Sequence, residues 1–259
     1  MQLTIYQVDA FADHCFEGNP AAVVPLEHWL PDDLMQAIAA ENNLSETAFF
    51  VAAGEDFHIR WFTPLNEVEL CGHATLASAY VLFHAIGVES DRLSFRSLSG
   101  FLSVFRQDEM LYLDFPAQVP QHCNTPASLV AGLGAIPEQC FVYADYIAVF
   151  ASEEDVAAIQ PDYSVLKQLD YRGVIITAPA SQQDFVVRFF APKYGVDEDP
   201  VTGSAYTQLT PYWSARLGKT VLRARQISRR GGNVMLEYRT DRVWIGGKAV
   251  MYLQGTIDI

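Results

Sequence analysis

The sequence predicts an α+β fold with two pseudo-symmetric domains, each a mostly antiparallel, curled sheet or barrel around a central apolar helix. An internal repeat is the first observation behind this prediction. The stretch "RWFTPLNEVELCGHATLASAYVLFHAIG" from Arg60 resembles "RFFAPKYGVDEDPVTGSAYTQLTPYWSARLG" from Arg188. The second observation is that each half combines several short strand patterns with one long, largely apolar segment.

The register of the repeat is nearly constant. Arg60 and Arg188 are 128 positions apart. After a three-residue insertion the offset becomes 131, so that Gly72 corresponds to Gly203 in the repeat. A period this long excludes a solenoid and indicates two related domains. We expect these domains at 1–117 and 125–259, joined by a proline-containing linker, and the last strand could return to the first domain.

Glu46 is the residue of the first half that most needs an explanation. The segment 31–41 has a proline and two aspartates at its start, which is typical of a helix, and residues 45–51 alternate as a strand does. This alternation puts Glu46 on one face with Ala48 and Phe50. A carboxylate at the start of an apolar strand is either a solvated rim residue, which is the default, or a buried group kept for chemistry.

Composition excludes several classes of partner. The chain has 259 residues, of which 50% are hydrophobic, and a formal net charge of −14 at pH 7. This acidity argues against binding to nucleic acid and to an anionic membrane surface. The apolar stretch 70–87 is too short to span a bilayer comfortably and contains two histidines, so we expect a buried helix.

The cysteines and the N-terminus favour a cytoplasmic protein. The four cysteines form no CxxC pattern, so free thiols in a reducing compartment are the simplest interpretation. The first residues, "MQLTIYQVDAF", lack the basic and apolar regions of a signal peptide.

Two glycine-containing turns are candidate anion sites. Gly72 in "CGHAT" and Gly203 in "TGSA" each precede a predicted helix. The free N–H groups and positive dipole end of a helix start suit a carboxylate or phosphate, although a glycine there can also serve close packing. We expect the two turns, with Ser204, to hold one anionic small molecule.

The side chains of the two halves differ where the backbones correspond. His73 corresponds to Ser204, and Cys71 corresponds to Thr202. Extending the 128 offset pairs Glu46 with Val174, so a fold that accepts valine there does not require the carboxylate. This is evidence against the rim interpretation of Glu46.

Other chemistries are disfavoured. Cys71 and His73 are two positions apart, where side chains tend to diverge, and "GSA" is not a nucleophile elbow. A metal site would need a second spaced ligand pair, which is missing, so we expect no metal. No dinucleotide fingerprint or P-loop is present.

Four motifs carry a family resemblance. "VDAF…GNPAAVV" at 8–24, "NLSETAFF" at 43–50, "RWFTPLNEVELCGHAT" at 60–75 and "GVDEDPVTGSA" at 195–205 occur in this order. Together they resemble the phenazine-biosynthesis PhzF-like family, which has the diaminopimelate epimerase fold, over nearly the whole chain. The resemblance implies two pseudo-symmetric domains with the active site between them, cofactor-free isomerase chemistry in a biosynthetic process and a homodimer.

The resemblance also implies roles for individual residues. The family's catalytic acid/base falls on Glu46, the histidine of its C-G-H-A motif on His73, and its supporting aspartate and serine on Asp199 and Ser204. The racemases of this fold use two cysteines, whereas here Cys71 is matched by Thr202. Two-thiol racemisation is therefore disfavoured, and we expect Cys71 to be a packing residue.

The resulting hypothesis is an isomerase that moves a proton between carbons of a small carboxylated metabolite. Glu46 would be the general acid/base, while His73 and Asp199 would bind polar groups of the substrate. Asn19 in "GNPAAVV" either contributes to substrate binding or serves the turn. An amino-acid racemase or epimerase and a non-catalytic metabolite-binding protein are the alternatives.

Overall fold

The computed structural model describes residues 1–259 and divides the chain into two compact units. Unit 1 comprises Met1–Phe115 and Gly246–Ile259, and unit 2 comprises Pro116–Ile245. These bounds differ from the expected ones at the linker, because residues 121–122 form strand β9 (Gln121–His122), which pairs with β10 (Gln139–Val142). The last strand, β17 (Ala249–Asp258), pairs with β1 (Gln2–Ala10) in unit 1.

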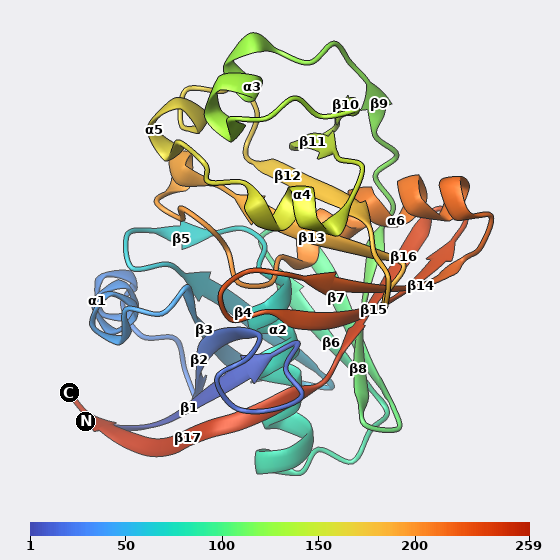
Figure 1. The fold of residues 1–259 in the computed structure, drawn as a ribbon. Helices are drawn as coiled ribbons and strands as arrows, with labels where there is room; N and C mark the ends of the chain where they lie inside the picture. Colours follow the sequence, from blue (N-terminus) through green and yellow to red (C-terminus); the bar gives the residue numbers. More distant parts are fainter. The chain divides into compact units, whose positions relative to one another are not determined.

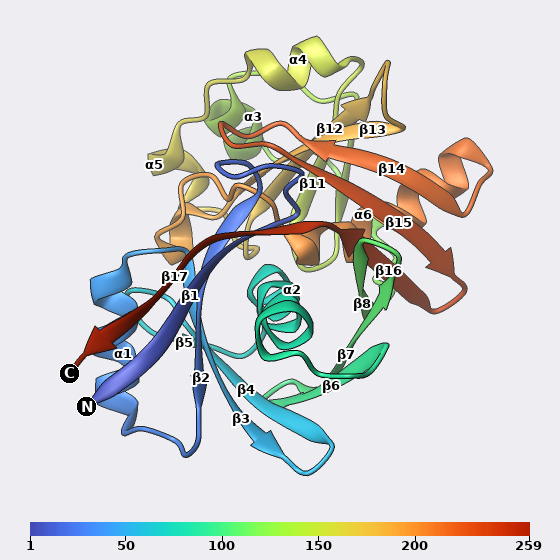
Figure 2. The same ribbon diagram turned by 90° about the horizontal axis from the view of Figure 1, so that it is seen from below.

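Unit 1 is a curled sheet around one helix. Its further strands are β2 (Asn19–Leu26), β3 (Glu46–Ala53), β4 (Asp56–Phe62), β5 (Glu67–Val68), β6 (Arg92–Ser97), β7 (Gly100–Gln107) and β8 (Met110–Pro116), and its helices are α1 (Asp32–Asn42), α2 (Gly72–Tyr80) and the π-helix η1 (Val81–Ile86). The sheet order is β17–β1–β2–β3–β4–β6–β7–β8. The pairs β2–β3 and β4–β6 are parallel, and the others are antiparallel. Figure 2 shows these strands arranged around α2.

The central helix of unit 1 is buried, as the apolar stretch 70–87 predicts. Residues 73–79 of α2 are all buried. The observed helix is shorter than expected, because it begins at Gly72 and continues from Val81 as a π-helix that ends at Gly87 with a φ of 80°. A side chain at Gly87 would be strained in this left-handed conformation. The outer helix α1 packs a second cluster, including Met35 and Ile38, against β2 and β3.

Unit 2 repeats this plan with extra helices. Its strands after β10 are β11 (Tyr146–Val149), β12 (Val174–Pro179), β13 (Phe185–Phe190), β14 (Val221–Gln226), β15 (Gly232–Arg239) and β16 (Arg242–Gly247), whose last two residues belong to unit 1. The helices are α3 (Ala127–Leu133), α4 (Glu153–Ala158), α5 (Tyr163–Leu166), the 3₁₀ turn η2 (Pro192–Tyr194) and α6 (Gly203–Leu217). Figure 1 shows α3, α4 and α5 on one side of β11, β12 and β13.

The ladder of unit 2 matches that of unit 1 strand by strand. The order β10–β11–β12–β13–β14–β15 has parallel pairs at β11–β12 and β13–β14, at the same places as β2–β3 and β4–β6. The central helix α6 buries Tyr206, Leu209 and Trp213, and the Trp213 ring stacks on Phe185 with centroids 5.2 Å apart. The predicted α+β fold with two pseudo-symmetric sheets around central helices is therefore confirmed.

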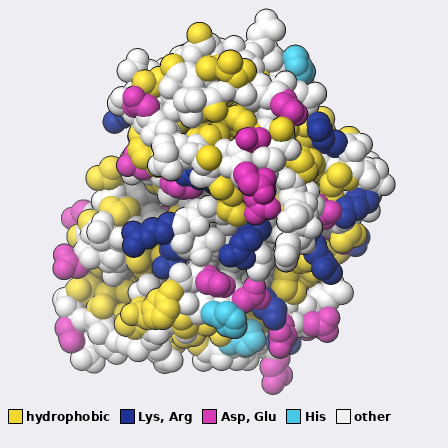
Figure 3. All heavy atoms as spheres, viewed as in Figure 1, with side chains coloured by type: hydrophobic (Ala, Val, Ile, Leu, Met, Phe, Trp, Pro, Cys, Tyr) yellow, Lys and Arg dark blue, Asp and Glu magenta, His cyan; other side chains and the backbone are white.

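The surface carries charges of both signs. On the face shown in Figure 3, acidic and basic side chains lie interspersed among apolar ones. None of the helices combines the length and the apolar character that crossing a membrane would require.

Candidate active site

Glu46 is the first residue of β3, at the start of an otherwise apolar strand. It lies opposite Ala21 in the parallel ladder with β2, and the following residues Thr47 and Ala48 are fully buried. The Glu46 side chain is 17% exposed. A carboxylate with so little exposure is not a solvated rim residue, and it needs a partner nearby.

His73 is that partner. It is the second residue of α2 and is buried, with its Nε2 3.1 Å from Oε2 of Glu46. This is an ion-pair distance, but neither atom makes a hydrogen bond in the protein. Two buried polar atoms at close range, each without a hydrogen bond, can both turn to a polar group of a bound molecule.

The other nitrogen of the His73 ring faces two further groups. Nδ1 lies 3.2 Å from Nδ2 of Asn19 and 3.6 Å from Sγ of Cys71. Asn19 begins β2 and is fully buried. The structure thus brings together Asn19, Glu46 and His73, which the sequence predicts as site residues, and adds Cys71 to them.

The expectation that the Cys71 and His73 side chains diverge is wrong. Cys71 is the N-cap of α2 and has an extended backbone, with φ −142° and ψ 109°, whereas His73 lies in the first helical turn. This change of backbone conformation between the two residues points their side chains at each other. Cys71 is buried, as a packing residue would be, but it also contacts the imidazole.

The environment shifts the protonation of this cluster. Burial favours the neutral form of His73, but the neighbouring Cys71 and Glu46 side chains outweigh burial and raise the pKa of His73 well above its usual value. The pKa of Cys71 rises to about 11, chiefly because the thiol is buried and secondly because Glu46 is close. At neutral pH the cluster therefore holds an imidazolium beside Glu46 and a neutral thiol.

The cluster also offers three potential metal ligands. One donor atom each of Glu46, Cys71 and His73 lies within 4.8 Å of the other two. Carboxylate, thiolate and imidazole are the ligand types of zinc. The sequence predicts no metal here, because it does not reveal that Cys71 and His73 are in contact.

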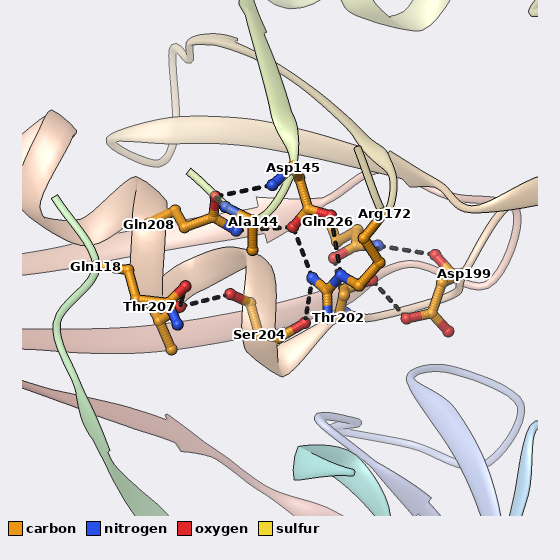
Figure 4. A network of polar contacts seen from close by, with 10 residues as sticks. All are labelled: Gln118, Ala144, Asp145, Arg172, Asp199, Thr202, Ser204, Thr207, Gln208 and Gln226. Carbon is orange, nitrogen blue, oxygen red and sulfur yellow. Dashed lines mark hydrogen bonds and ion pairs between the residues drawn. The ribbon is translucent and has the colours of Figure 1, made fainter. Parts of the chain in front are cut away.

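Unit 2 presents a different network at the start of its central helix (Figure 4). Thr202 is the N-cap of α6, and its hydroxyl donates to the carboxylate of Asp199. Gln226 accepts from the Thr202 amide at 2.9 Å and donates to the Asp199 carbonyl at 2.8 Å. These bonds hold Thr202, the residue before Gly203 at the start of α6, to Asp199 and Gln226.

Ser204 is held by an arginine that the sequence analysis missed. Nη2 of Arg172 donates to Oγ of Ser204 at 2.9 Å, and Arg172 also forms two hydrogen bonds, of 2.9 and 2.6 Å, with the carboxylate of Asp145. Asp145 is fully buried and accepts a third bond from Gln208. Burial disfavours the arginine's charge, but the bond and charge of Asp145 outweigh it and raise the pKa of Arg172.

The pairing of Glu46 with Val174 is off by one residue. In the antiparallel ladders, Thr47 lies opposite Phe62 and Val174 lies opposite Phe190, and the repeat relates Phe62 to Phe190. Val174 therefore corresponds to Thr47, so Glu46 corresponds to Gly173. The reason is one extra residue of unit 2 in the connection between β12 and β13, which an offset carried backward along the sequence cannot detect.

Comparison with known proteins identifies the family. The chain matches the family of phenazine biosynthesis-like proteins over residues 8–255. It is 52% identical to an uncharacterized isomerase of Pseudomonas aeruginosa over 259 residues, which cover the whole of both chains. It is 42% identical to the mouse phenazine biosynthesis-like domain-containing protein 1 over 287 residues, which cover 99% of each.

Solved structures agree with this assignment. The crystal structure of a PhzF family protein of Enterococcus faecalis matches with a TM-score of 0.98 and 48% identity, over all of both chains. A hydroxyproline epimerase of Agrobacterium vitis, at 9% identity and a TM-score of 0.65, shares the fold. The protein thus has the fold of the epimerase-like enzymes. It belongs to the phenazine biosynthesis-like (PhzF) family.

Proposed function

We propose that the protein is a cofactor-independent isomerase that shifts a proton between two carbons of a small carboxylated metabolite. The observation that carries this proposal is the Glu46–His73 pair, with 3.1 Å between Oε2 and Nε2. Family membership and relatives named as isomerases support the reaction class. In this proposal Glu46 is the general acid/base.

The proton moves in two steps. The Glu46 carboxylate removes a proton from a carbon that a neighbouring conjugated group makes acidic, and the electrons of the broken C–H bond pass into that conjugated system. The resulting carboxylic acid then returns the proton to another carbon of the same system. The imidazolium of His73 stabilises the negative charge that develops on the substrate, because its raised pKa keeps it protonated.

The other predicted residues bind the substrate in this proposal. Asn19, which contacts His73 at 3.2 Å, belongs to the catalytic cluster, and Gly72 supplies a backbone N–H at the start of α2. In unit 2, Gly203 and Ser204 bind the carboxylate, and Asp199 binds a polar substituent.

An amino-acid racemase or epimerase is the second candidate. Sγ of Cys71 lies 3.6 Å from Nδ1 of His73, which gives the cluster a second group able to carry a proton. Against this candidate, the thiol has a pKa of about 11 and is a weak acid at neutral pH. A purely metabolite-binding protein would not need a carboxylate and an imidazolium together, which disfavours the third alternative.

The test of the proposed function is solvent-proton exchange. A thermal-shift screen of cyclic and amino-acid carboxylates identifies a ligand, because binding to the folded state raises the melting temperature. Incubation of that ligand in deuterated water should then incorporate deuterium at carbon, detected by mass spectrometry. Glu46→Gln keeps the shape of the side chain but removes the acid/base, and it should slow incorporation about 100-fold or more. Full activity of this variant would refute the proposal.

Two further properties follow from the family and the cysteines. We propose that the protein is a homodimer located in the cytoplasm, with a role in a biosynthetic process. All four cysteines are free, as expected in a reducing compartment. Light scattering after gel filtration tests the dimer, and fractionation of cells that produce the protein tests the location.

A further inference from the structure

Arg172 offers a hydrogen-bonding edge that the protein does not use. The guanidinium uses Nε and Nη2 for its bonds to Asp145 and Ser204, and none of its hydrogen bonds involves Nη1. The Arg172 side chain as a whole is 38% exposed. Nη1 therefore has two N–H donors for a bound molecule.

The Ser204 hydroxyl is oriented by the same arginine. Because Nη2 of Arg172 donates to Oγ, the oxygen acts as the acceptor in that bond. Ser204 makes no side-chain hydrogen bond as a donor, so the hydroxyl hydrogen is left for another acceptor. Arg172 and Ser204 together thus present neighbouring donors, a pattern that suits the two oxygens of a carboxylate.

Buried groups fix the position of these donors. Asp145 is fully buried, and its carboxylate binds the guanidinium on one side and Nε2 of Gln208, at 2.7 Å, on the other. Oε1 of Gln208 in turn accepts from the backbone amides of residues 144 and 145. Figure 4 shows this chain of contacts, from Gln208 through Asp145 and Arg172 to Ser204. A site held in this way loses little entropy on binding.

The repeat supplies an independent argument. In unit 1, the second residue of the central helix, His73, faces Glu46 from the start of β3. In unit 2, the second residue of the central helix, Ser204, faces Arg172, which lies two residues before β12 begins. The place that holds an anionic proton acceptor in one unit thus holds a cation in the other, as expected if one unit performs chemistry and the other binds an anion.

We propose that Arg172 is a specificity-determining residue that binds the carboxylate group of the substrate together with Ser204. This proposal rests on the proposed function, and it adds the residue that selects carboxylates over their neutral analogues. The negative charge of Asp145 neutralises the positive charge of Arg172. The selectivity for carboxylates therefore comes from hydrogen-bond donors that point at the carboxylate from short range. Salt should therefore weaken binding only slightly.

The experiment compares carboxylates with their neutral amides. Benzoate, 2-aminobenzoate and proline are titrated into the protein by calorimetry, each alongside its carboxamide. The wild type should bind at least one carboxylate more tightly than the matching amide. Arg172→Gln should weaken that carboxylate about 10- to 100-fold, the usual effect of a lost charge-assisted bond, and leave the amide unchanged. Arg223→Gln removes an exposed arginine of β14 and should change neither.

A second variant separates binding from a structural role, because Arg172→Gln alone leaves Asp145 buried without its partner. The double variant Asp145→Asn/Arg172→Gln removes both charges and should restore stability without restoring selectivity for the carboxylate. A double variant that still prefers the carboxylate, or a wild type that prefers none of the three, would overturn the proposal.

The outcomes also distinguish this inference from the proposed function. If Glu46→Gln abolishes deuterium incorporation while Arg172→Gln binds carboxylates normally, the proposed isomerase function is supported and the proposed role of Arg172 is refuted. If Arg172→Gln loses carboxylate selectivity while Glu46→Gln still exchanges protons, the carboxylate site is supported and the isomerase mechanism with Glu46 as acid/base is refuted.

Discussion

In unit 1, the start of the central helix meets a carboxylate, whereas in unit 2 the equivalent helix start meets a guanidinium. His73 contacts Glu46 at 3.1 Å, and Ser204 contacts Arg172 at 2.9 Å. The backbones differ little, since both N-caps are extended and the strand ladders match pair by pair. The two halves of a duplicated fold can thus keep the same backbone arrangement while the charged group beside the central helix changes from a carboxylate to a guanidinium.

Packing explains why unit 2 cannot carry its charged group at the position that corresponds to Glu46. Gly173 is the residue of unit 2 that corresponds to Glu46. A Cβ atom there would lie 2.7 Å from the Phe189 ring and 2.8 Å from the backbone oxygen of Phe190. Unit 2 therefore has no room for a side chain at this position, and its charged group comes from the preceding residue, Arg172.

The largest expected difference between the units lies at a pair of equivalent arginines. Arg188 is 10% exposed and binds Glu198 and the carbonyls of Val156 and Ile159, whereas Arg60 is 22% exposed and binds Glu67 and the exposed Asp32. Arg188→Gln should lower the free energy of unfolding by about 3 to 4 kcal/mol, because it leaves the partly buried carboxylate of Glu198 and two buried carbonyl partners unpaired. Arg60→Gln should cost about 1 kcal/mol. Urea unfolding measures the loss of unfolding free energy in both variants. Equal losses would show that the two arginines stabilise their units equally, which would contradict this prediction.

The next effect concerns the missing side chain of unit 2. Gly173→Ala should destabilise the protein by about 2 to 3 kcal/mol, because the backbone oxygen of Phe190 cannot move away cheaply. Gly134→Ala is the matched control in the same unit. It has a φ of +67° and nothing within 4 Å of the added Cβ, so only the strain of about 1 kcal/mol applies. A Gly173→Ala variant as stable as the control would contradict the packing explanation.

The third prediction ranks the groups of the unit 1 cluster by their effect on turnover. His73→Gln should slow deuterium incorporation about 10- to 100-fold, because it removes the imidazolium beside Glu46. Cys71→Ala should retain most activity, because a neutral thiol contributes little proton transfer at pH 7. Alkylation of Cys71 by iodoacetamide at pH 8 should be about 100-fold slower than that of a free thiol of ordinary pKa. If Cys71→Ala is as inactive as Glu46→Gln, the racemase alternative gains over the isomerase.

The sequence predicts much of unit 1 and less of unit 2, for physical reasons. The fold follows from the repeat and the apolar central segments, and Glu46 is conspicuous because a carboxylate interrupts an apolar strand. The Arg172–Asp145 pair has no such signal, because the two residues are far apart in sequence and belong to no motif. The contact of Cys71 with His73 depends on the extended N-cap, and the match of Glu46 with Gly173 depends on the strand register. Neither can be read from residue spacing alone.

The smallest and most specific difference between the units is a pH dependence that only unit 1 should show. His73 faces Glu46, Cys71 and Asn19, and its pKa in the folded protein lies well above the usual value. A group whose pKa is raised by folding stabilises the folded state fully below its unfolded pKa, about 6.5, and this contribution is lost as pH rises through the folded pKa. The difference in unfolding free energy between wild type and His73→Gln should therefore be constant below about pH 6 and decrease at higher pH. Cys71, with a pKa of about 11, contributes in the same direction but only above about pH 9, so Cys71→Ala separates the two groups. Ser204→Ala, at the equivalent position of unit 2, removes no group that titrates in this range. The difference in unfolding free energy between wild type and Ser204→Ala should not change between pH 5 and 9. A slope like that of His73→Gln in this variant would show that the imidazolium of His73 is not the source of the pH dependence.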